Sequence, residues 1–243
     1  MCGRFVARND LATLTSVFDL PRSTPGNAPA SLPANYNTAP TQAVFMVSER
    51  DRVRHLEVAR WGLIPSWAKD PSIASRLINA RSETVAEKPS FRAAFARRRC
   101  LIPVDGFYEW QAVTGPGQRK QPFYIHPAAT SDPVGLAGLY EDWRNPAVPD
   151  PAGLGAWIRT CTILTMPATG DLTAIHHRMP VAVPGNLRDP WLDPQPPMAD
   201  LLTDVVESTA HAQPGLWAAH PVTRAVNQVA NNTVDLIRSA PPE

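Results

Sequence analysis

Apolar residues recur at helical or strand-like spacing along much of the chain, and this spacing predicts its first secondary-structure elements. A helix is predicted where apolar residues recur every three or four positions, with Asn9 or Asp10 as its cap and Pro21 at its end. Its apolar face consists of Leu11, Leu14, Val17 and Phe18. Two strands follow, one at the apolar run 43–47 and one at 52–61, where Val53, Leu56, Val58 and Trp61 are the apolar members.

The central part of the chain predicts a β-hairpin. Residues 100–104 and 106–110 are apolar and aromatic, and we interpret them as one strand that bends at Asp105. A glycine- and proline-rich turn through 115–117 then leads into the apolar run 122–125. Such a turn between two apolar runs predicts that they pair as antiparallel strands.

Helices are fewer than strands in the remaining pattern. Residues 82–95 have helical character, but Pro89 divides them into two short pieces. A later helix at 198–210 carries Leu201, Leu202, Val205 and Val206 on one face. Further strands are predicted at 134–140, 160–165 and 179–183.

The order of these elements indicates the fold class. Many strands joined by turns, with scattered helices and no regular strand–helix alternation, favour an α+β fold. We expect a mainly antiparallel, barrel-like β core with peripheral helices, in a single domain over 1–243. Segments rich in proline, alanine and small polar residues predict an ordered loop at 21–40 and a surface loop at 145–155. Residues 239–243 are expected to form a flexible tail.

Composition narrows the class of protein. Hydrophobic residues make up 44% and charged residues 19% of 243 positions, which is typical of a globular protein. Because 23 Lys and Arg nearly balance 22 Asp and Glu, any nucleic-acid surface must be a local patch. The 27 prolines favour turns and edge strands over a helical bundle.

The cysteines and the apolar runs exclude several further classes. The three cysteines show no CxxC spacing, so we expect neither a disulfide framework nor a zinc site, and no cofactor. No apolar stretch is long enough to span a membrane, and the first twenty residues do not resemble a signal peptide. We therefore expect a cytoplasmic protein.

Cys2 directly follows the initiator methionine. Removal of Met1 would place a free α-amine and a thiol on adjacent carbons. Such a 1,2-aminothiol condenses with an aldehyde to an imine, which the thiol closes into a thiazolidine ring. The amine and the thiol titrate near ~8 and ~8.5, so both are partly nucleophilic at neutral pH. On position alone, a buried cysteine without a chemical role is the more common outcome.

Four segments combine polar residues with Gly, Pro or Trp where a plain core would be apolar. They are Met-Cys-Gly-Arg-Phe at 1–5, Leu-Ile-Asn-Ala-Arg-Ser-Glu-Thr at 77–84, Pro-Val-Asp-Gly-Phe-Tyr-Glu-Trp at 103–110 and Ile-His-His-Arg-Met-Pro at 175–180. Supporting segments lie at 36–40 (Tyr-Asn-Thr-Ala-Pro), 61–65 (Trp-Gly-Leu-Ile-Pro) and 220–223 (His-Pro-Val-Thr). In this order they resemble the SOS response-associated peptidase (SRAP) family, also called the abasic-site-processing family, over essentially the whole chain.

The resemblance implies a chemistry for Cys2. Family members hold abasic sites in single-stranded DNA as a covalent crosslink, so mature Cys2 is expected to form a thiazolidine with the ring-opened sugar aldehyde. Asn79, Glu109 and His176 match the other catalytic positions. Asn79 would orient the sugar, and Glu109 would exchange protons from an apolar setting that raises its pKa. His176 would assist sugar opening or crosslink reversal, whereas we assign the adjacent His177 a structural role.

The same resemblance suggests a DNA surface. Arg81 and Arg178 follow Asn79 and His176 by two residues each, an alternation that on a strand would place each pair on one face. Their guanidinium groups are expected to bind the phosphates that flank the lesion, and Arg4 is a third candidate because it accompanies Cys2. Trp67 and Trp110 would stack on bases, and Pro40 would wedge between them. For Trp61 we favour a core role. The arginine run at 92 and 97–99 extends this track or, equally well, forms a solvated helix end.

Two other functional classes remain open at this point. An N-terminal cysteine peptidase, with self-removal of Met1 as its minimal activity, would use the Cys2 thiol against an amide. A passive binder of single-stranded nucleic acid would use the arginines and tryptophans without chemistry. An imine at the N-terminal amine would also permit β-elimination, a lyase activity. The 145–155 loop and the tail depart from the family pattern without touching a chemical segment.

Overall fold

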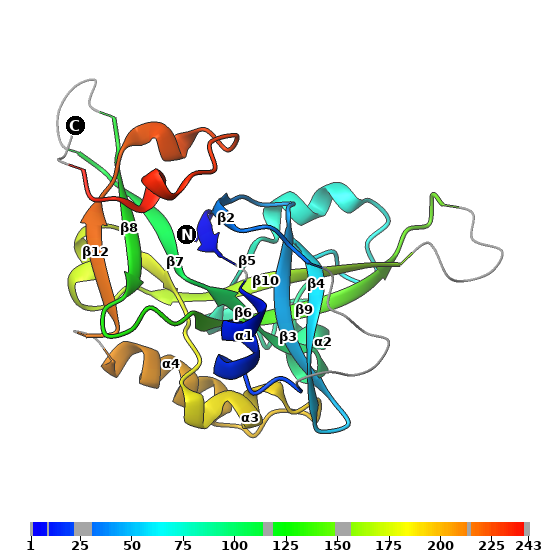
Figure 1. The fold of residues 1–243 in the computed structure, drawn as a ribbon. Helices are drawn as coiled ribbons and strands as arrows, with labels where there is room; N and C mark the ends of the chain where they lie inside the picture. Colours follow the sequence, from blue (N-terminus) through cyan, green and yellow to red (C-terminus); the bar gives the residue numbers. More distant parts are fainter. Residues whose placement is uncertain are drawn as a thin grey trace.

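Five strands close into a barrel at the centre of the molecule (Figure 1). The computed structural model describes residues 2–8, 10–21, 31–113, 119–148, 157–212 and 215–240. The barrel strands are β3 (Ala43–Arg50), β4 (Val53–Trp61), β6 (Arg99–Val104), β9 (Val134–Arg144) and β10 (Trp157–Pro167). Neighbours pair in the order β10-β4-β3-β6-β9 and back to β10. Each of these pairs is antiparallel except β4 with β10, which is parallel.

Two short strands extend the barrel beside the second half of β10. β5 (Asn79–Arg81) runs parallel to β10, with Asn79 opposite Ile163. β11 (Arg178–Pro180) runs antiparallel to β10, with Arg178 opposite Pro167. Both therefore end at the same part of the barrel wall.

A second, fully antiparallel sheet stands next to the barrel. Its strands, in spatial order, are β12 (Trp217–Pro221), β8 (Gln121–Pro127), β7 (Gly106–Gln111), β1 (Phe5–Ala7) and β2 (Asn35–Thr38). The chain passes from β6 of the barrel into β7 of this sheet through Asp105. Gly106 is required at this crossing, because a Cβ there would lie 2.6 Å from the Ile125 carbonyl oxygen and from the Tyr124 ring.

Helices lie outside the sheets. Figure 1 shows α3 and α4 along one side of them, with α1 nearby. The α-helices are α1 (Leu11–Val17), α2 (Arg92–Arg97), α3 (Arg188–Leu192) and α4 (Leu201–His211). Short 3₁₀ turns are η1 (Pro71–Arg76), η2 (Ser82–Thr84), η3 (Gly170–Ala174), η4 (Gly185–Leu187), η5 (Arg224–Asn227) and η6 (Val234–Ile237). Asp10 caps α1 as predicted, since its carboxylate accepts from the Ala12 amide and the Thr13 hydroxyl.

One apolar core joins the barrel to the second sheet. It includes Phe107 and Ile125 from the sheet and Phe45 from the barrel, all nearly inaccessible to solvent. The Phe5 and Trp61 rings meet across the junction at 4.8 Å between centroids. Trp61 is fully buried, which confirms its predicted core role.

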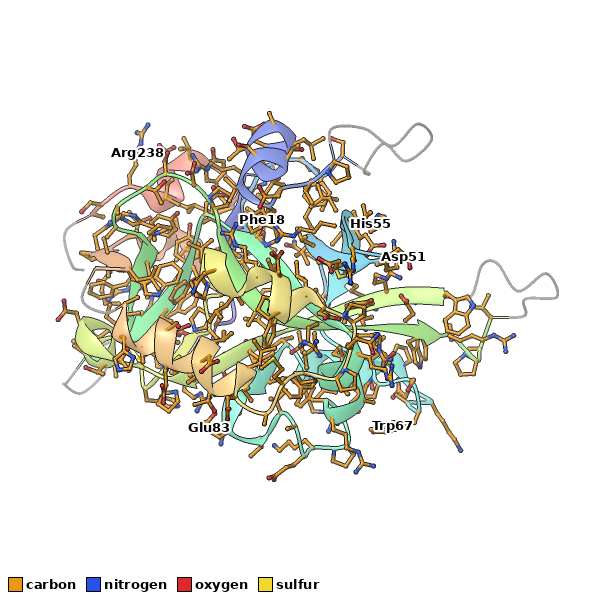
Figure 2. The ribbon with its side chains drawn as sticks, turned by 90° about the horizontal axis from the view of Figure 1, so that it is seen from below. Phe18, Asp51, His55, Trp67, Glu83 and Arg238 are labelled. Carbon is orange, nitrogen blue, oxygen red and sulfur yellow. The ribbon has the colours of Figure 1, made fainter. Side chains whose placement is uncertain are left out.

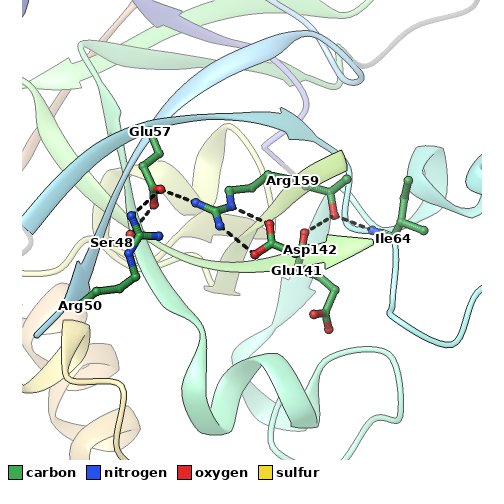
Figure 3. A network of polar contacts seen from close by, with 8 residues as sticks. Ser48, Arg50, Glu57, Ile64, Glu141, Asp142 and Arg159 are labelled. Carbon is green, nitrogen blue, oxygen red and sulfur yellow. Dashed lines mark hydrogen bonds and ion pairs between the residues drawn. The ribbon is translucent and has the colours of Figure 1, made fainter. Parts of the chain in front are cut away.

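Arg159 on β10 reinforces the barrel where the ladder between β4 and β10 is short (Figure 3). That ladder pairs Arg60 with Thr160 and Trp61 with Cys161. Arg159 binds both oxygens of Asp142 on β9 at 2.6 and 2.7 Å. It also binds Glu57 on β4, which accepts from Ser48 and pairs with Arg50. This network therefore links β3, β4, β9 and β10 through their side chains.

The fold class predicted from the sequence is confirmed: the protein is α+β, mainly antiparallel and barrel-like, in one domain. Two local predictions were wrong. The expected bent strand at 100–110 is two strands in two sheets, because Gly106 lets the chain cross between them. The loop expected at 21–40 contains β2, which pairs with β1. The turn 115–117, most of the 145–155 loop and residues 241–243 lie outside the described residues.

Neither a membrane span nor a metal cluster is found in the part of the chain that the structure describes. No helix there is long and apolar enough to cross a membrane. No group of three or more His, Cys, Asp and Glu side chains in the same residues is placed to hold a metal ion.

Candidate active site

The four predicted catalytic residues converge at the junction between the barrel and the second sheet. Cys2 precedes β1, Asn79 opens β5, Glu109 lies on β7, and His176 lies between η3 and β11. The Asn79 side-chain amide donates to the Cys2 carbonyl at 2.8 Å. His176 Nε2 lies 3.9 Å from Glu109 Oε2. The Glu109 charge in turn acts on the Cys2 thiol, so the two pairs form one site.

Cys2 is completely buried in the described structure. Burial raises the pKa of its thiol well above the ordinary value, and the nearby Glu109 carboxylate raises it further. The thiol is therefore protonated at neutral pH. Nucleophilic use of the sulfur requires a group that accepts its proton.

Glu109 is the neighbouring group suited to that task. Only 3% of the residue is exposed, and burial raises the pKa of its carboxyl above the ordinary range. The neighbouring Tyr108 is fully buried, and Phe123 lies opposite Glu109 on β8. The pKa of Glu109 is thus shifted in the direction that the sequence indicated, towards the working pH of a proton-exchanging group.

His176 presents Nε2 to Glu109. Burial lowers the pKa of its imidazole, so the ring is neutral at neutral pH. His176 Nδ1 lies 3.0 Å from the Arg178 main-chain nitrogen and 3.1 Å from the Arg178 carbonyl oxygen, so the main chain of Arg178 fixes the ring. The exposed His177 ring packs against His176 at 4.3 Å between centroids. His177 is therefore an exposed neighbour of the site, and its structural role stays a prediction.

Asn79 is positioned from two directions. The β5 ladder fixes it beside β10, and the Trp61 indole donates to the carbonyl of the preceding Ile78 at 2.9 Å. Its Nδ2 holds the Cys2 main chain, while its buried Oδ1 has no hydrogen-bond partner among the described residues. That oxygen is an acceptor available to a hydroxyl or an amine bound beside Cys2.

Arg4 and Trp110 are tied to the C-terminal segment 224–232. Arg4 NH1 donates to Asn37 Oδ1 at 2.7 Å and to the Val226 carbonyl at 2.9 Å. The Trp110 indole donates to Asn227 Oδ1 at 2.8 Å. The last part of the chain therefore holds two side chains of the predicted DNA surface, and Figure 1 shows it beside the N-terminal strands.

Asn37 is a positioning residue that the sequence alone did not single out. It is 1% exposed, and its Nδ2 donates to the carbonyls of Val226, Gln228 and Asn231. Its Oδ1 accepts from Arg4. The only sequence feature that pointed to Asn37 was its place in the supporting segment 36–40. The carbonyls that accept from its Nδ2 lie about two hundred residues away along the chain.

The remaining predicted arginines occupy different settings. Arg81 is exposed on β5, on the same side of the strand as Asn79. Arg178 is buried and pairs with Glu83 through two hydrogen bonds. The alternation that we expected for His176 and Arg178 does not apply, because β11 begins only at Arg178.

The arginine run is not a continuous phosphate track. Arg99 is 2% exposed, and its guanidinium donates to the main-chain carbonyls of Phe95, Ala96 and Trp191. Arg98 pairs with the buried Glu141. These two side chains hold α2, β9 and the end of α3 together and are committed to that role.

Pro40 and Trp67 lie outside the buried constellation. Pro40 is half-buried in a turn whose next residue, Thr41, has a φ of 74°, a left-handed conformation that β-branched residues rarely adopt. The Thr41 amide donates to the Trp61 carbonyl at 2.8 Å, so the turn is fixed to the end of β4. Trp67 is 58% exposed, and Figure 2 shows it at the edge of the molecule.

The fold and the site together define an α+β barrel protein with a cysteine-centred polar site close to its N-terminus. The chain belongs to the SOS response associated peptidase (SRAP) family, whose model matches residues 1–229. The matched region includes the four catalytic candidates and most of the segment that holds Arg4 and Trp110.

Curated relatives cover nearly the whole chain. The chain is similar to the abasic site processing protein YoqW of Bacillus subtilis, with 34% identity over 239 residues, 98% of this chain and 100% of that protein. It is 31% identical to the abasic site processing protein YedK of Escherichia coli, over 98% of this chain and 99% of that protein. A chicken relative, the abasic site processing protein HMCES, is 31% identical over 84% of this chain and 65% of its own length.

Solved structures support the fold. A Bacteroides thetaiotaomicron protein superposes with a TM-score of 0.78 at 22% identity, over 98% of this chain and 100% of that one. A Bordetella bronchiseptica protein superposes with a TM-score of 0.68 at 27% identity, over 91% and 100% respectively.

Proposed function

We propose that this protein processes abasic sites in single-stranded DNA by forming a covalent thiazolidine crosslink through Cys2 after Met1 has been removed. The relatives named as abasic site processing proteins support the lesion as substrate. The single observation that carries the proposal is the placement of Asn79, Glu109 and His176 around Cys2.

The reaction needs two bonds to one carbon. The Cys2 α-amine attacks the aldehyde carbon of the ring-opened sugar and forms a carbinolamine. Protonated Glu109 gives its proton to the leaving hydroxyl, so water departs and an iminium ion forms. The Cys2 sulfur then adds to that carbon, and its proton passes to the Glu109 carboxylate. Each crosslink releases one water and leaves Glu109 in its starting state.

The environment of each group suits its part in this sequence. Because burial keeps the Cys2 thiol protonated, ring closure depends on a base. Burial also raises the pKa of Glu109, which makes its carboxyl a better proton acceptor than an exposed carboxylate. Asn79 Oδ1 would accept from the sugar or the amine. The neutral His176 would assist opening of the sugar and reversal of the crosslink.

DNA would be held by a local surface, since the net charge of the protein is only +1. We assign phosphate contacts to Arg4, Arg81 and Arg178, and base contacts to Trp67, Trp110 and Pro40. The exposure of Arg81 and Trp67 supports these roles directly. The protein would act as a cytoplasmic monomer that joins the nucleoid when bound.

Incubation with single-stranded DNA that carries one abasic site tests the proposal. We expect a heat-stable shifted band from the wild type and none from Cys2→Ala. Cys161→Ala is the matched control, because Cys161 is equally buried but lies in the barrel, and it should retain the band. The absence of a band from the wild type, or its persistence in Cys2→Ala, would overturn the assignment.

The family description favours a second candidate, an N-terminal cysteine peptidase whose minimal activity is self-removal of Met1. Intact mass distinguishes it: retention of Met1 in Cys2→Ser, in a host with normal methionine processing, would support self-cleavage. A lyase activity would appear as cleaved DNA strands instead of a stable band. Binding that ignores the lesion and gives neither product would identify a passive binder.

A further inference from the structure

A buried arginine of the predicted DNA surface already has a partner in the described structure. The Arg178 side chain is 7% exposed, whereas the Glu83 side chain facing it is 45% exposed. Arg178 NH1 donates to Glu83 Oε1 at 2.5 Å, and NH2 donates to Oε2 at 2.9 Å. The two residues are 95 positions apart, so the pair is a tertiary contact between η2 and β11.

The Glu83 carboxylate binds the edge of the Arg178 guanidinium to which a phosphate would bind. The two parallel N–H groups of NH1 and NH2 are the pair that binds a carboxylate or a phosphate bidentately. NH2 also donates to the Thr165 carbonyl at 2.5 Å, and Nε is buried without a hydrogen-bond partner in the described part of the chain. The remaining donors therefore do not offer a second parallel pair, so Glu83 and a phosphate cannot bind bidentately together.

Glu83 lies on the solvent side of this pair. Figure 2 shows Glu83 at the edge of the molecule. The Ser82 hydroxyl donates to its Oε2 at 3.1 Å, and the hydrogen bond from Arg178 lowers the pKa of Glu83 to about 2. The carboxylate is thus charged at any ordinary pH, and it can swing outward without opening the core.

We propose that Glu83 occupies a phosphodiester site on Arg178 in the DNA-free protein and must be displaced when DNA binds. This inference rests on the proposed function, because it assumes that the surface binds single-stranded DNA. Glu83 then limits DNA affinity: each binding event exchanges one anionic partner of Arg178 for another. The carboxylate keeps the buried guanidinium paired whenever the phosphate is absent.

The test compares Glu83→Gln with Glu87→Gln. Glu87 is an exposed glutamate of the same segment, so its change removes the same charge without touching Arg178. With a short undamaged single-stranded oligonucleotide, we expect Glu83→Gln to bind about five-fold tighter or more, because a charge-assisted competitor is lost. Glu87→Gln should change the Kd by less than about two-fold, as for an ordinary surface charge.

Salt dependence gives an independent readout. In the wild type, the displaced Glu83 carboxylate lies near the bound phosphate and repels it, and salt screens this repulsion. In Glu83→Gln the repulsion is gone, so the gain in affinity should be largest at low salt and the slope of log Kd against log salt concentration should steepen. In an Arg178→Gln background, Glu83→Gln should give no more gain than Glu87→Gln.

The outcomes separate this inference from the proposed function. Weaker or unchanged binding by Glu83→Gln, with its thermal unfolding unchanged, would overturn the inference and make Glu83 a residue that orients Arg178. Glu83→Ala provides the same comparison if the glutamine variant folds poorly. A wild type that crosslinks abasic DNA while Glu83→Gln shows no gain contradicts only the role of Glu83. A wild type that binds no DNA contradicts both.

Discussion

At the scale of single residues, the site places a buried thiol beside a buried carboxyl. Burial raises the pKa of both Cys2 and Glu109, so both favour their neutral forms. Such an arrangement stabilises neither ionised group. In the proposed reaction, Glu109 therefore gives up its proton first and can accept the thiol proton only afterwards. The same burial makes Glu109 a cost to folding at neutral pH.

Replacement of this carboxyl should therefore stabilise the protein. Between the ordinary carboxyl pKa of about 4.3 and the raised folded value, the unfolded chain has released its proton while the folded chain keeps it. Rising pH then favours unfolding. Glu109→Gln should raise Tm at neutral pH by roughly 2–4 °C for each kcal/mol that the carboxyl costs, and crosslinking should slow strongly.

Thermal unfolding of the wild type and of Glu109→Gln over a range of pH measures this difference in Tm. The advantage of Glu109→Gln should disappear towards about pH 4, where the carboxyl is protonated in both states. A Tm that falls on substitution, with a loss that grows as pH rises, would show instead that the ionised carboxylate stabilises the fold.

The sequence pointed to the four residues of the site but not to the residues that hold the surrounding side chains in position. The family resemblance matched Cys2, Asn79, Glu109 and His176 to catalytic positions, and the structure brings the four residues to one junction, while their catalytic roles stay predictions. Asn37 and Glu83 were missed as individuals. Their roles depend on partners separated by 189 and 95 positions, and no local spacing reveals such contacts.

At the scale of elements, the barrel depends on side chains where its backbone pairing is short. Arg159 connects β10 to Asp142 on β9 and to Glu57 on β4 (Figure 3). Only part of each of these side chains is exposed, so the ions are incompletely solvated. Removal of the central cation leaves two carboxylates next to each other without their common partner.

We therefore expect Arg159→Met to destabilise the protein by about 2 kcal/mol, between the values for exposed and fully buried ion pairs. Arg50→Met is the matched control, because Arg50 contacts the same Glu57 but is 45% exposed. Its cost should stay below about 1 kcal/mol. Urea denaturation measures the free energy of unfolding of the two variants. Equal losses for Arg159→Met and Arg50→Met would contradict the role of Arg159 between β4 and β10.

The long strands were predictable, whereas two of the short strands at the site were not. The apolar runs at 43–47 and 134–140 and the mixed pattern at 52–61 predicted β3, β9 and β4. β1 and β5 have three residues each, which is too short for a period to appear, and β11, equally short, overlaps the strand predicted at 179–183. Tertiary pairing stabilises these three strands, and they are the ones that carry or flank the site.

At the scale of the whole molecule, the two ends of the chain meet at the site. The N-terminal Arg4 binds the Val226 carbonyl, 222 residues away. Asn37 fixes the same segment from β2, and Asn227 holds Trp110 on β7. The proposed role of Cys2 as a nucleophile requires a fixed position, and these contacts hold the N-terminal segment in place.

The most direct test of the central claim is the mass of the adduct formed with abasic single-stranded DNA. We expect the protein in the adduct to lack Met1 and the complex to weigh the sum of protein and DNA less one water. Fragmentation should locate the sugar on residue 2. A sugar attached to any other residue, or a crosslinked chain that still carries Met1, would contradict the proposed chemistry of Cys2.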